Sequence, residues 1–264
     1  MAGIPALLAL LALLAFGSAP LIVLLLILAG AWGYGEYLGV FSQGRPPALP
    51  LSLGVGLGAL PGIGAGVWGV GGLAAGLFAA VAAAGLLLLP RVAEDKALAR
   101  QDLGAVLAGL VLVPWMVAHA ILILARPGGR FLLLFLVAVL VLNDTLAYFA
   151  GNLLGRTPLM PAVSPKKTVE GSLGGLAGGV LAGWLAGLSP AALESALSPG
   201  MLLFLGVFLA AAGQAGDLLE SKFKRLNDVK DSGVFLPGHG GLLDRLDAFL
   251  LATPLLYYIG VPVG

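Results

Sequence analysis

Apolar stretches that approach the thickness of a bilayer recur along almost the whole chain, and they constrain its fold more than any other feature. A helix that crosses a membrane needs about 20 consecutive apolar residues, because its backbone polar groups must be paired internally where water is absent. Of the 264 residues, 59% are hydrophobic and only 10% are charged, whereas soluble domains are about 45–50% apolar and about 25% charged. The sequence therefore predicts an all-α polytopic membrane protein with one membrane-embedded domain over 1–264.

Nine apolar segments are expected to form transmembrane helices, or seven or eight if the short amino-terminal pieces fuse or only dip into the membrane. They cover residues 4–16, 21–37, 49–60, 65–89, 103–125, 131–153, 172–188, 201–216 and 246–263. The first segment has no basic region before it and no separate cleavage site after it. We therefore interpret it as retained rather than as a signal peptide.

Basic residues are distributed very unevenly between the loops. We assign to one side of the membrane the four loops around residues 41–48, 90–102, 154–170 and 217–245. That side then holds twelve of the fourteen Lys and Arg residues, and the other side keeps only Arg126 and Arg130. Because loops rich in Lys and Arg stay in the cytoplasm, the amino terminus is expected inside and the carboxyl terminus outside. No basic arm stands apart from these loops, so nucleic-acid binding is not expected.

Residues 217–247 hold the densest mixture of charges in the chain. The acidic members are Asp217, Glu220, Asp228, Asp231, Asp244 and Asp247, and the basic members are Lys222, Lys224, Arg225, Lys230 and Arg245. A turn at 237–241, Pro-Gly-His-Gly-Gly, separates the two halves. Such a mixture suits a metal ion with phosphates, and a basic cytoplasmic loop with acids for solubility is the simpler alternative.

The spacing within this stretch indicates which side chains share a face. If the preceding helix continues past residue 216, steps of three and four residues align Gln214, Asp217, Ser221 and Lys224. After the turn, Asp244 and Asp247 fall in the first turn of the next helix. Magnesium is usually held by one or two carboxylates together with phosphates and water. Asp217 and Asp244, if they meet, therefore predict a Mg²⁺ site.

Asn143 and Asp144 lie inside a long apolar run. A carboxylate near the centre of a bilayer costs about 2.5–3.5 kcal/mol on insertion scales, so it usually faces a polar cavity. Tyr148, Gly151 and Asn152 continue a polar stripe toward the cytoplasmic end. The sequence predicts either a cavity lined by Asp144 or a polar network that packs helices.

The segment 164–171, Ser-Pro-Lys-Lys-Thr-Val-Glu-Gly, predicts an anion site. Serine before proline is typical of an N-cap followed by the first helical residue, so Ser164 is expected to begin a helix. The amide groups of that helix would lie beside Lys166 and Lys167, and a helix N-terminus binds anions. A patch for lipid headgroups or a signal for membrane orientation is the alternative.

Two glycine-rich regions indicate close helix packing. Glycines crowd residues 54–76, and a glycine stands at every fourth position from 171 to 187. Small residues at this spacing let helices approach closely in lipid, and the second stripe leaves a subunit interface, and hence a homodimer, open. His119, which stands near Trp115 in an apolar run, is interpreted as a neutral packing residue rather than as a ligand.

Three of these segments together resemble the signatures of phosphatidate cytidylyltransferases, the CDP-diacylglycerol synthases. The longest match reads, in order and spacing, Ser221, Lys224-Arg225, Lys230-Asp231, Gly233, Leu236-Pro237, His239-Gly240-Gly241 and Asp244-Arg245-Leu246-Asp247. The other two are Asn-Asp-Thr-Leu-Ala-Tyr-Phe-Ala-Gly at 143–151 and the segment 164–171. The amino-terminal half is similar to the family only in hydropathy.

The resemblance implies an enzyme that condenses CTP with phosphatidic acid, giving CDP-diacylglycerol and pyrophosphate, with Mg²⁺ and room for a second cation. The implied catalytic residues are Asp217, Asp244, Lys224, Lys230 and His239, and the implied metal ligands are Asp217, Asp244 and Asp247. The implied substrate-binding residues are Ser164, Lys166, Lys167, Thr168, Ser221, Arg225, Asp231, Gly240, Gly241, Arg245 and Asp144. His239 would position or contact a phosphate, because phosphoryl transfer depends mostly on alignment and charge neutralisation.

The same resemblance implies which part of the chain is catalytic and in which membrane the protein lies. Residues 1–125 would pack and face lipid, and residues 126–264 would carry the catalytic helices and cytoplasmic loops. The expected surroundings are the lipids of a bacterial inner membrane, with the site on its cytoplasmic side. Two alternatives remain: another CTP-dependent lipid enzyme, of the polyprenol kinase or CDP-archaeol synthase type, and a membrane transporter with Asp144 on its permeation path.

Overall fold

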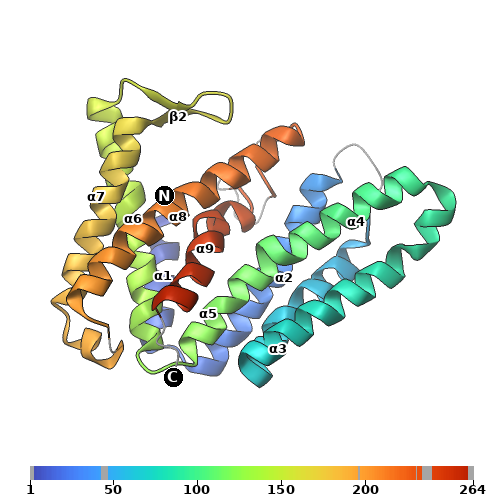
Figure 1. The fold of residues 1–264 in the computed structure, drawn as a ribbon, viewed down its shortest axis with the longest axis horizontal. Helices are drawn as coiled ribbons and strands as arrows, with labels where there is room; N and C mark the ends of the chain where they lie inside the picture. The colour runs from blue at the N-terminus through green and yellow to red at the C-terminus, as the bar shows by residue number, and fades with distance from the viewer. Residues whose placement is uncertain (1–2, 43–46, 196, 230, 234–239, 261–264) are drawn as a thin grey trace. The chain divides into compact units, whose positions relative to one another are not determined.

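The computed structural model describes residues 3–42, 47–195, 197–229, 231–233 and 240–260 (Figure 1). Its helices are α1 (Gly3–Phe16), α2 (Ala19–Phe41), α3 (Leu51–Glu94), α4 (Lys96–Leu110), α5 (Met116–Leu124), α6 (Gly129–Leu154), α7 (Val169–Gly187), α8 (Pro199–Leu226) and α9 (Leu243–Leu255). Short helical turns lie at η1 (Val111–Trp115), η2 (Pro190–Ser195) and η3 (Leu256–Gly260). The strands β1 (Pro158–Met160) and β2 (Ser164–Thr168) pair as a hairpin between α6 and α7. The predicted all-α class is confirmed.

Five helices within the described part of the chain are long and apolar enough to cross a membrane. They cover Ala19–Phe41, Leu51–Val92, Lys96–Leu124, Gly129–Leu154 and Pro199–Leu226, and a shorter apolar helix covers Leu7–Phe16. The helical rise of about 1.5 Å per residue makes even α2 longer than the roughly 30 Å hydrocarbon core. A polytopic membrane protein is confirmed, and the count of nine spans stays a prediction.

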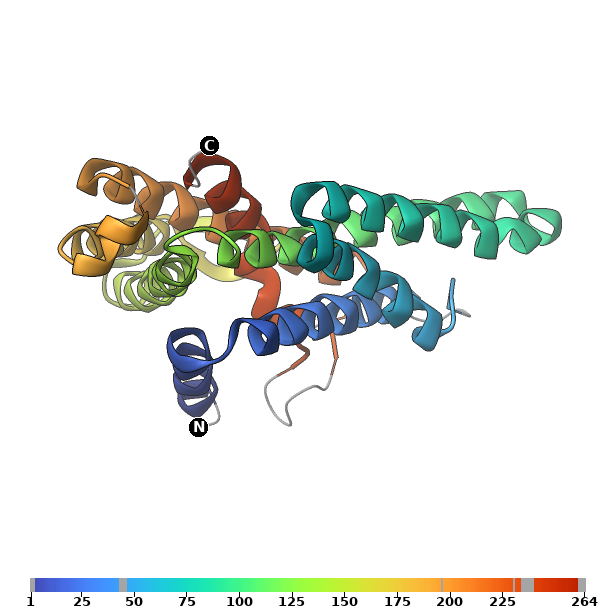
Figure 2. The same cartoon turned by 90° about the horizontal axis from the view of Figure 1, so that it is seen from below.

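The chain bends within α3 at a different place from the predicted one. The sequence analysis separated two spans at 61–64, but the helix runs through Pro61 and leaves helical geometry only at Trp68 and Gly69. Gly69 has φ +62° and ψ −138°, a conformation that glycine adopts without steric cost because it has no Cβ. Figure 2 shows the two halves of α3 running in different directions from this bend.

The chain folds as two compact units whose segments alternate along the sequence. The first unit comprises residues 1–6, 17–122 and 226–246, and the second comprises residues 7–16, 123–225 and 247–264. Both units draw on residues before and after 125, where the sequence analysis divided packing helices from catalytic ones. That functional division stays a prediction.

Close backbone contacts hold the first unit together. The two halves of α3 touch, because a Cβ added to Gly64 or to Gly72 would meet the backbone carbonyl of the other residue. Tyr34 of α2 is fully buried, and its hydroxyl donates to the Val106 carbonyl of α4 at 3.0 Å. The packing role predicted for the glycines of 54–76 is confirmed.

The glycine stripe of α7 packs the second unit. Helices α6, α7 and α8 lie side by side (Figure 1), and the stripe meets both neighbours of α7. A Cβ on Gly171 would lie 3.0 Å from the Ala147 carbonyl of α6, and one on Gly183 would lie 2.5 Å from the Leu202 carbonyl of α8. The stripe is therefore used inside the chain, and the homodimer that it left open stays a prediction.

His119 is a packing residue, as predicted. Its side chain is fully buried, and its Nδ1 donates to the Trp115 carbonyl at 2.9 Å, since a carbonyl oxygen can only accept. The two rings meet edge to face with centroids 4.5 Å apart. The Nδ1 of His119 therefore bonds to the backbone, and the imidazole ring packs against the Trp115 ring.

Candidate active site

The predicted anion segment forms a strand rather than the start of a helix. Residues Ser164–Thr168 pair with β1, and the residue that caps α7 is Thr168, whose Oγ1 accepts from the Gly171 amide at 3.1 Å. The prediction of Ser164 as an N-cap is wrong. Pro165 suits a first helical turn, but it is equally compatible with the edge of a hairpin, and the pairing with β1 decides between them.

Glu170 joins the hairpin to the first turn of α7. Its Oε2 accepts from the backbone amides of Arg156 at 3.1 Å and Thr157 at 3.2 Å. Its own backbone N–H and then these two amides lower the pKa of the Glu170 carboxyl to about 2, because hydrogen bonds to a carboxylate favour its ionised form. Glu170 is therefore ionised at neutral pH and holds the start of the hairpin segment against α7.

The contribution of Glu170 to stability should be constant near neutrality and disappear only in acid. A carboxyl with a depressed folded pKa stabilises the fold above its unfolded value of 4.5 and loses that effect as pH falls through about 2. The difference in Tm between wild type and Glu170→Gln should be flat from about pH 8 to about pH 5.5 and should narrow below about pH 4.5. A difference that already changes between neutral pH and about pH 6 would contradict these hydrogen bonds.

A cavity of about 420 Å³ lies inside the second unit, where α6, β2, α7 and α8 contribute to its wall. Six of the predicted site residues line it: Asp144, Ser164, Lys166, Lys167, Thr168 and Asp217. Three segments that are far apart in the sequence thus bring carboxylates and ammonium groups to one space. The expectation that Asp144 faces a polar cavity is confirmed.

Asp144 also belongs to a polar network, the second expectation for this region. The hydroxyl of Ser172 donates to Gln214 Oε1 at 2.5 Å, and Gln214 Nε2 donates to Asn143 Oδ1 at 2.7 Å. Asn143 Nδ2 in turn donates to Asp144 Oδ1 at 3.0 Å. Gly175 leaves room for the two amides, since a Cβ there would lie 2.5 Å from Asn143 Oδ1. The network fixes both amide orientations and ends on the Asp144 carboxylate.

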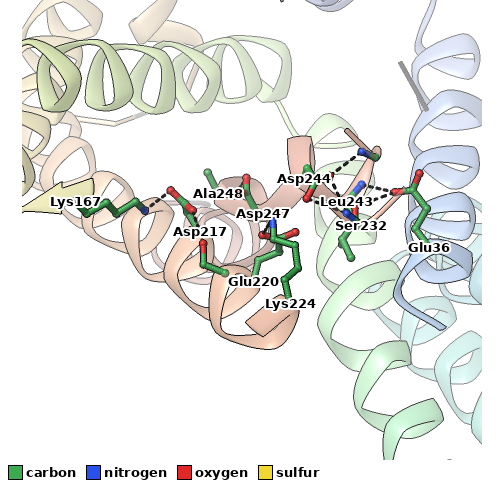
Figure 3. A network of polar contacts seen from close by, with 12 residues as sticks. Glu36, Lys167, Asp217, Glu220, Lys224, Ser232, Leu243, Asp244, Asp247 and Ala248 are labelled. Atoms are coloured by element: carbon green, nitrogen blue, oxygen red, sulfur yellow. Dashed lines mark hydrogen bonds and ion pairs between the residues drawn. The ribbon is translucent and has the colours of Figure 1, made fainter. Parts of the chain in front are cut away.

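Asp217 pairs with the Lys167 ammonium group at the cavity (Figure 3). Helix α8 runs without a break from Pro199 to Leu226, so the condition set in the sequence analysis, a helix that continues past residue 216, is met. Ser221, one turn after Asp217, donates its hydroxyl to Asp217 Oδ1 at 3.4 Å. The Lys167 and Asp217 side chains are 30% and 36% exposed. Because the pair is accessible, an incoming polyanion can compete with Asp217 for Lys167.

The last turn of α8 carries two further predicted cations, Lys224 and Arg225. Lys224 Nζ lies 2.6 Å from Glu220 Oε2, and the Glu220 side chain is 4% exposed. Arg225 is exposed in the last turn. A carboxylate on the preceding turn therefore holds Lys224.

Helix α9 approaches α8 closely at Asp247. A Cβ on Gly216 would meet the Asp247 carbonyl, and a Cβ on Gly213 would lie 3.6 Å from Ala248 Cβ. Asp247 Oδ1 accepts from the Ala248 amide at 2.7 Å. Asp247 thus lies beside the turn of α8 that carries Asp217, and both supply the hard oxygen donors that Mg²⁺ prefers.

Asp244, in the first unit, organises the turn that precedes α9 (Figure 3). Its Oδ2 accepts from the Gly241 amide at 2.7 Å and from the Ser232 amide at 3.0 Å. Gly240 has φ +80°, which favours glycine, and a Cβ there would lie 2.6 Å from Asp244 Oδ2. The carboxylate therefore shapes the turn in addition to any ligand that it binds.

Several predicted roles are not decided by these contacts. Asp217 and Asp244 belong to different units, and their shared Mg²⁺ stays a prediction. Lys230 and His239 lie outside the described residues. Three other predicted site residues are described and are exposed: Arg225, Asp231 and Arg245. Within the described segments, no three Asp, Glu or His side chains form a metal-binding group.

Glu36 is a polar site residue that the sequence analysis did not name. Its carboxylate accepts from the Leu243 amide at 2.8 Å, at the start of α9. The available signal was a lone charge in an otherwise apolar helix, which usually has a functional or pairing role. The sequence could not supply its partner, because 207 residues separate Glu36 from Leu243.

The sequence is similar to one described protein family over almost its whole length. The model of the cytidylyltransferase family matches residues 1–261. The chain is 44% identical to the phosphatidate cytidylyltransferase of Staphylococcus saprophyticus over 131 residues, which are 50% of this chain and 49% of that protein. It is 45% identical over 117 residues to the phosphatidate cytidylyltransferase of Bacillus subtilis, covering 44% of this chain and 42% of that one. The chain thus spans about half the length of the curated relatives it matches.

Proposed function

Because the chain belongs to the cytidylyltransferase family, we propose that it transfers the cytidylyl group of CTP to phosphatidic acid, giving CDP-diacylglycerol and pyrophosphate. Relatives that are named phosphatidate cytidylyltransferase support this choice of acceptor. The observation that carries the proposal is the cavity where Lys166 and Lys167 meet the carboxylates of Asp144 and Asp217. Such a space offers cations for phosphates and acids for a metal ion.

The proposed reaction exchanges one phosphorus–oxygen bond for another. A phosphatidate oxygen attacks the α-phosphorus of CTP, and the bond from that phosphorus to the oxygen bridging the α- and β-phosphates breaks. Pyrophosphate leaves with the electron pair. Phosphatidate is already an anion near neutral pH, so a strong protein base is unnecessary. The protein must therefore align the two phosphates and neutralise their charge.

The lysines of β2 are assigned to the phosphates. Successive side chains of a strand leave on opposite faces, yet both Lys166 and Lys167 line the cavity, so they can reach a ligand from two directions. Lys167 is paired with Asp217 before substrate arrives. A triphosphate carries more negative charge than one carboxylate, and we expect Lys167 to transfer its contact to phosphate and free the oxygens of Asp217.

Mg²⁺ fits the chemistry of the acids in this region. In the second unit, the backbone of Asp247 contacts α8 at Gly216, next to Asp217, and we assign both aspartates to the ion, with Asp244 as the further ligand that the sequence predicts. When bound, the ion would neutralise phosphate charge and favour departure of pyrophosphate. Asp144, which Asn143 holds by a hydrogen bond, would accept a second cation or orient a lysine.

Phosphatidate is expected to reach the cavity from within the bilayer, because drawing acyl chains into water is costly. Apolar or aromatic residues among the lining support this route: Tyr148, Leu159 and Leu218. The bias of Lys and Arg toward one set of loops supports a site on the cytoplasmic face. We assign the protein to a bacterial inner membrane, because the relatives reported above come from bacteria.

The proposed function predicts product chemistry that separates it from its nearest alternatives. Protein in nanodiscs is given Mg²⁺ and CTP labelled in the α-phosphate, with phosphatidate, with a polyprenol, or without lipid. With phosphatidate, label should enter the lipid fraction and one pyrophosphate should appear per labelled lipid. Chelation with EDTA should stop both, and added Mg²⁺ should restore them.

Other products would contradict the proposal. A polyprenol kinase would form CDP that keeps the α-label in the polyprenol arm, and a cytidylyltransferase for another lipid phosphate would label no lipid in the phosphatidate arm. A transporter would release no pyrophosphate in the discs, and after reconstitution into sealed liposomes it would show solute flux without CTP. Heat-denatured protein in the same discs controls for hydrolysis of CTP by contaminants.

A further inference from the structure

Glu36 accepts hydrogen bonds from three groups in the first unit, and Figure 3 shows two of the donors, Ser232 and Leu243. The Leu243 amide donates to Oε2 at 2.8 Å, and the Ser232 hydroxyl donates to the same oxygen at 3.5 Å. Trp32 Nε1, one turn earlier on α2, donates to Oε1 at 3.2 Å. Leu243 is the first residue of α9, so a carboxylate from α2 caps that helix, where negative charge is favourable.

The Glu36 carboxylate also fills the space beside two glycines of the segment 217–247, Gly233 and Gly241. A Cβ on Gly241 would lie 2.5 Å from Glu36 Oε2, and a Cβ on Gly233 would lie 2.8 Å from Glu36 Oε1. Either residue with a side chain would push the carboxylate away. Glycine at these two positions therefore leaves the space that the Glu36 carboxylate occupies.

The Asp244 carboxylate contacts the same two short stretches of chain. It accepts from the backbone amides of Ser232 and Gly241. Two carboxylates, one from α2 and one from α9, therefore join residues 231–233 to residues 241–243. We call these two short stretches the loop base, because they flank the glycine-containing turn of the segment 217–247.

We propose that Glu36 is a positioning residue for the proposed cytidylyl transfer. It acts by joining the two stretches of the loop base, residues 231–233 and residues 241–243. The inference rests on the proposed function, because Asp244 and Asp231 belong to the residues predicted to meet metal and substrate. Glu36 touches neither ligand in this role. It fixes the backbone from which Asp244 extends, and an error of about 1 Å in a reacting group can cost about 10²-fold in rate.

The test compares three variants. Glu36→Ala removes all three hydrogen bonds, and Glu36→Gln keeps the shape but can accept with only one of its two terminal atoms. Asp95→Asn is the matched control, because Asp95 caps α4 through the amides of Ala97 and Leu98 and makes no described contact with the loop base. Each protein is measured per folded molecule, with Tm and a monodisperse elution peak as the criteria.

Two readouts are required. Steady-state pyrophosphate release should show kcat lowered about 10²-fold in Glu36→Ala and about tenfold in Glu36→Gln, with KM for CTP changed less than about twofold. Hydrogen exchange read by mass spectrometry should show faster exchange of the Leu243 amide in both Glu36 variants. Asp95→Asn should match wild type in both readouts.

The proposal is overturned if Glu36→Ala turns over like wild type once corrected for folded protein, or if its Leu243 amide exchanges at the wild-type rate. Equal loss of activity in Glu36→Ala and Asp95→Asn would also overturn it, since that result indicates general destabilisation. If wild-type protein releases no pyrophosphate, the proposed function fails, and hydrogen exchange alone still decides whether Glu36 closes the loop base.

Discussion

Asp217→Asn should lower pyrophosphate release by about 10²- to 10³-fold while leaving the protein folded, the range seen when one electrostatic contact to a transition state is removed. Asp217 lines the cavity, pairs with Lys167 and receives the Ser221 hydroxyl. The amide keeps the shape of the side chain but removes its charge and one of its oxygen donors. The measurement is the turnover number in nanodiscs with CTP, Mg²⁺ and phosphatidate.

Asp228→Asn is the matched control for this substitution. It makes the same chemical change at an exposed residue just past α8, with φ of 55°, and asparagine adopts that conformation as readily as aspartate. We expect wild-type turnover from this variant. Wild-type turnover from folded Asp217→Asn would remove Asp217 from the proposed metal and phosphate chemistry.

Lys167→Met should lower kcat/KM for CTP by about 10²-fold, and more than Lys166→Met does. Lys167 is half-buried and paired with Asp217, whereas Lys166 is exposed on the same strand. Methionine preserves the length and apolar stem of the side chain and removes only the ammonium group. The kinetics of both variants, measured over a range of CTP concentrations, provide the comparison.

The double variant Lys167→Met/Asp217→Asn distinguishes a shared role from two separate ones. Substitutions of residues that act as a unit have non-additive effects on activity. The double variant should therefore be about as active as the less active of the two single variants. If the two losses multiply, the ion pair seen at the cavity has no part in turnover. A loss in Lys166→Met equal to that in Lys167→Met would contradict the assignment of Lys167 as the principal phosphate contact.

The helices of this protein were predictable because hydropathy acts over neighbouring residues. Apolar runs long enough to cross a bilayer leave helices as the default solution. The polar face of α8 followed from steps of three and four residues on the condition that the helix continues past residue 216, and the structure meets that condition. The start of α9 just before Asp244 followed from the return of apolar sequence, but Asp247, which was also expected in the first turn, lies just beyond it.

Two local predictions failed where local signals were ambiguous. Ser164 before Pro165 has the form of an N-cap, but pairing of β2 with β1 gives that role to Thr168. The sequence analysis ended one span at residue 60 and began the next at 65, yet the bend of α3 lies at Gly69. In both cases contacts with another segment chose between conformations that the short sequence allows equally.

The sequence by itself determined that the chain is helical and membrane-embedded, and it located the charges that a phosphate chemistry would need. Only the tertiary structure decided that Lys167 meets Asp217 across 50 residues and that Glu36 meets Leu243 across 207. The physical reason is the range of the forces involved. Hydropathy and helical periodicity are properties of adjacent residues, whereas a hydrogen bond between distant side chains exists only once packed helices have brought its donor and acceptor within about 3 Å.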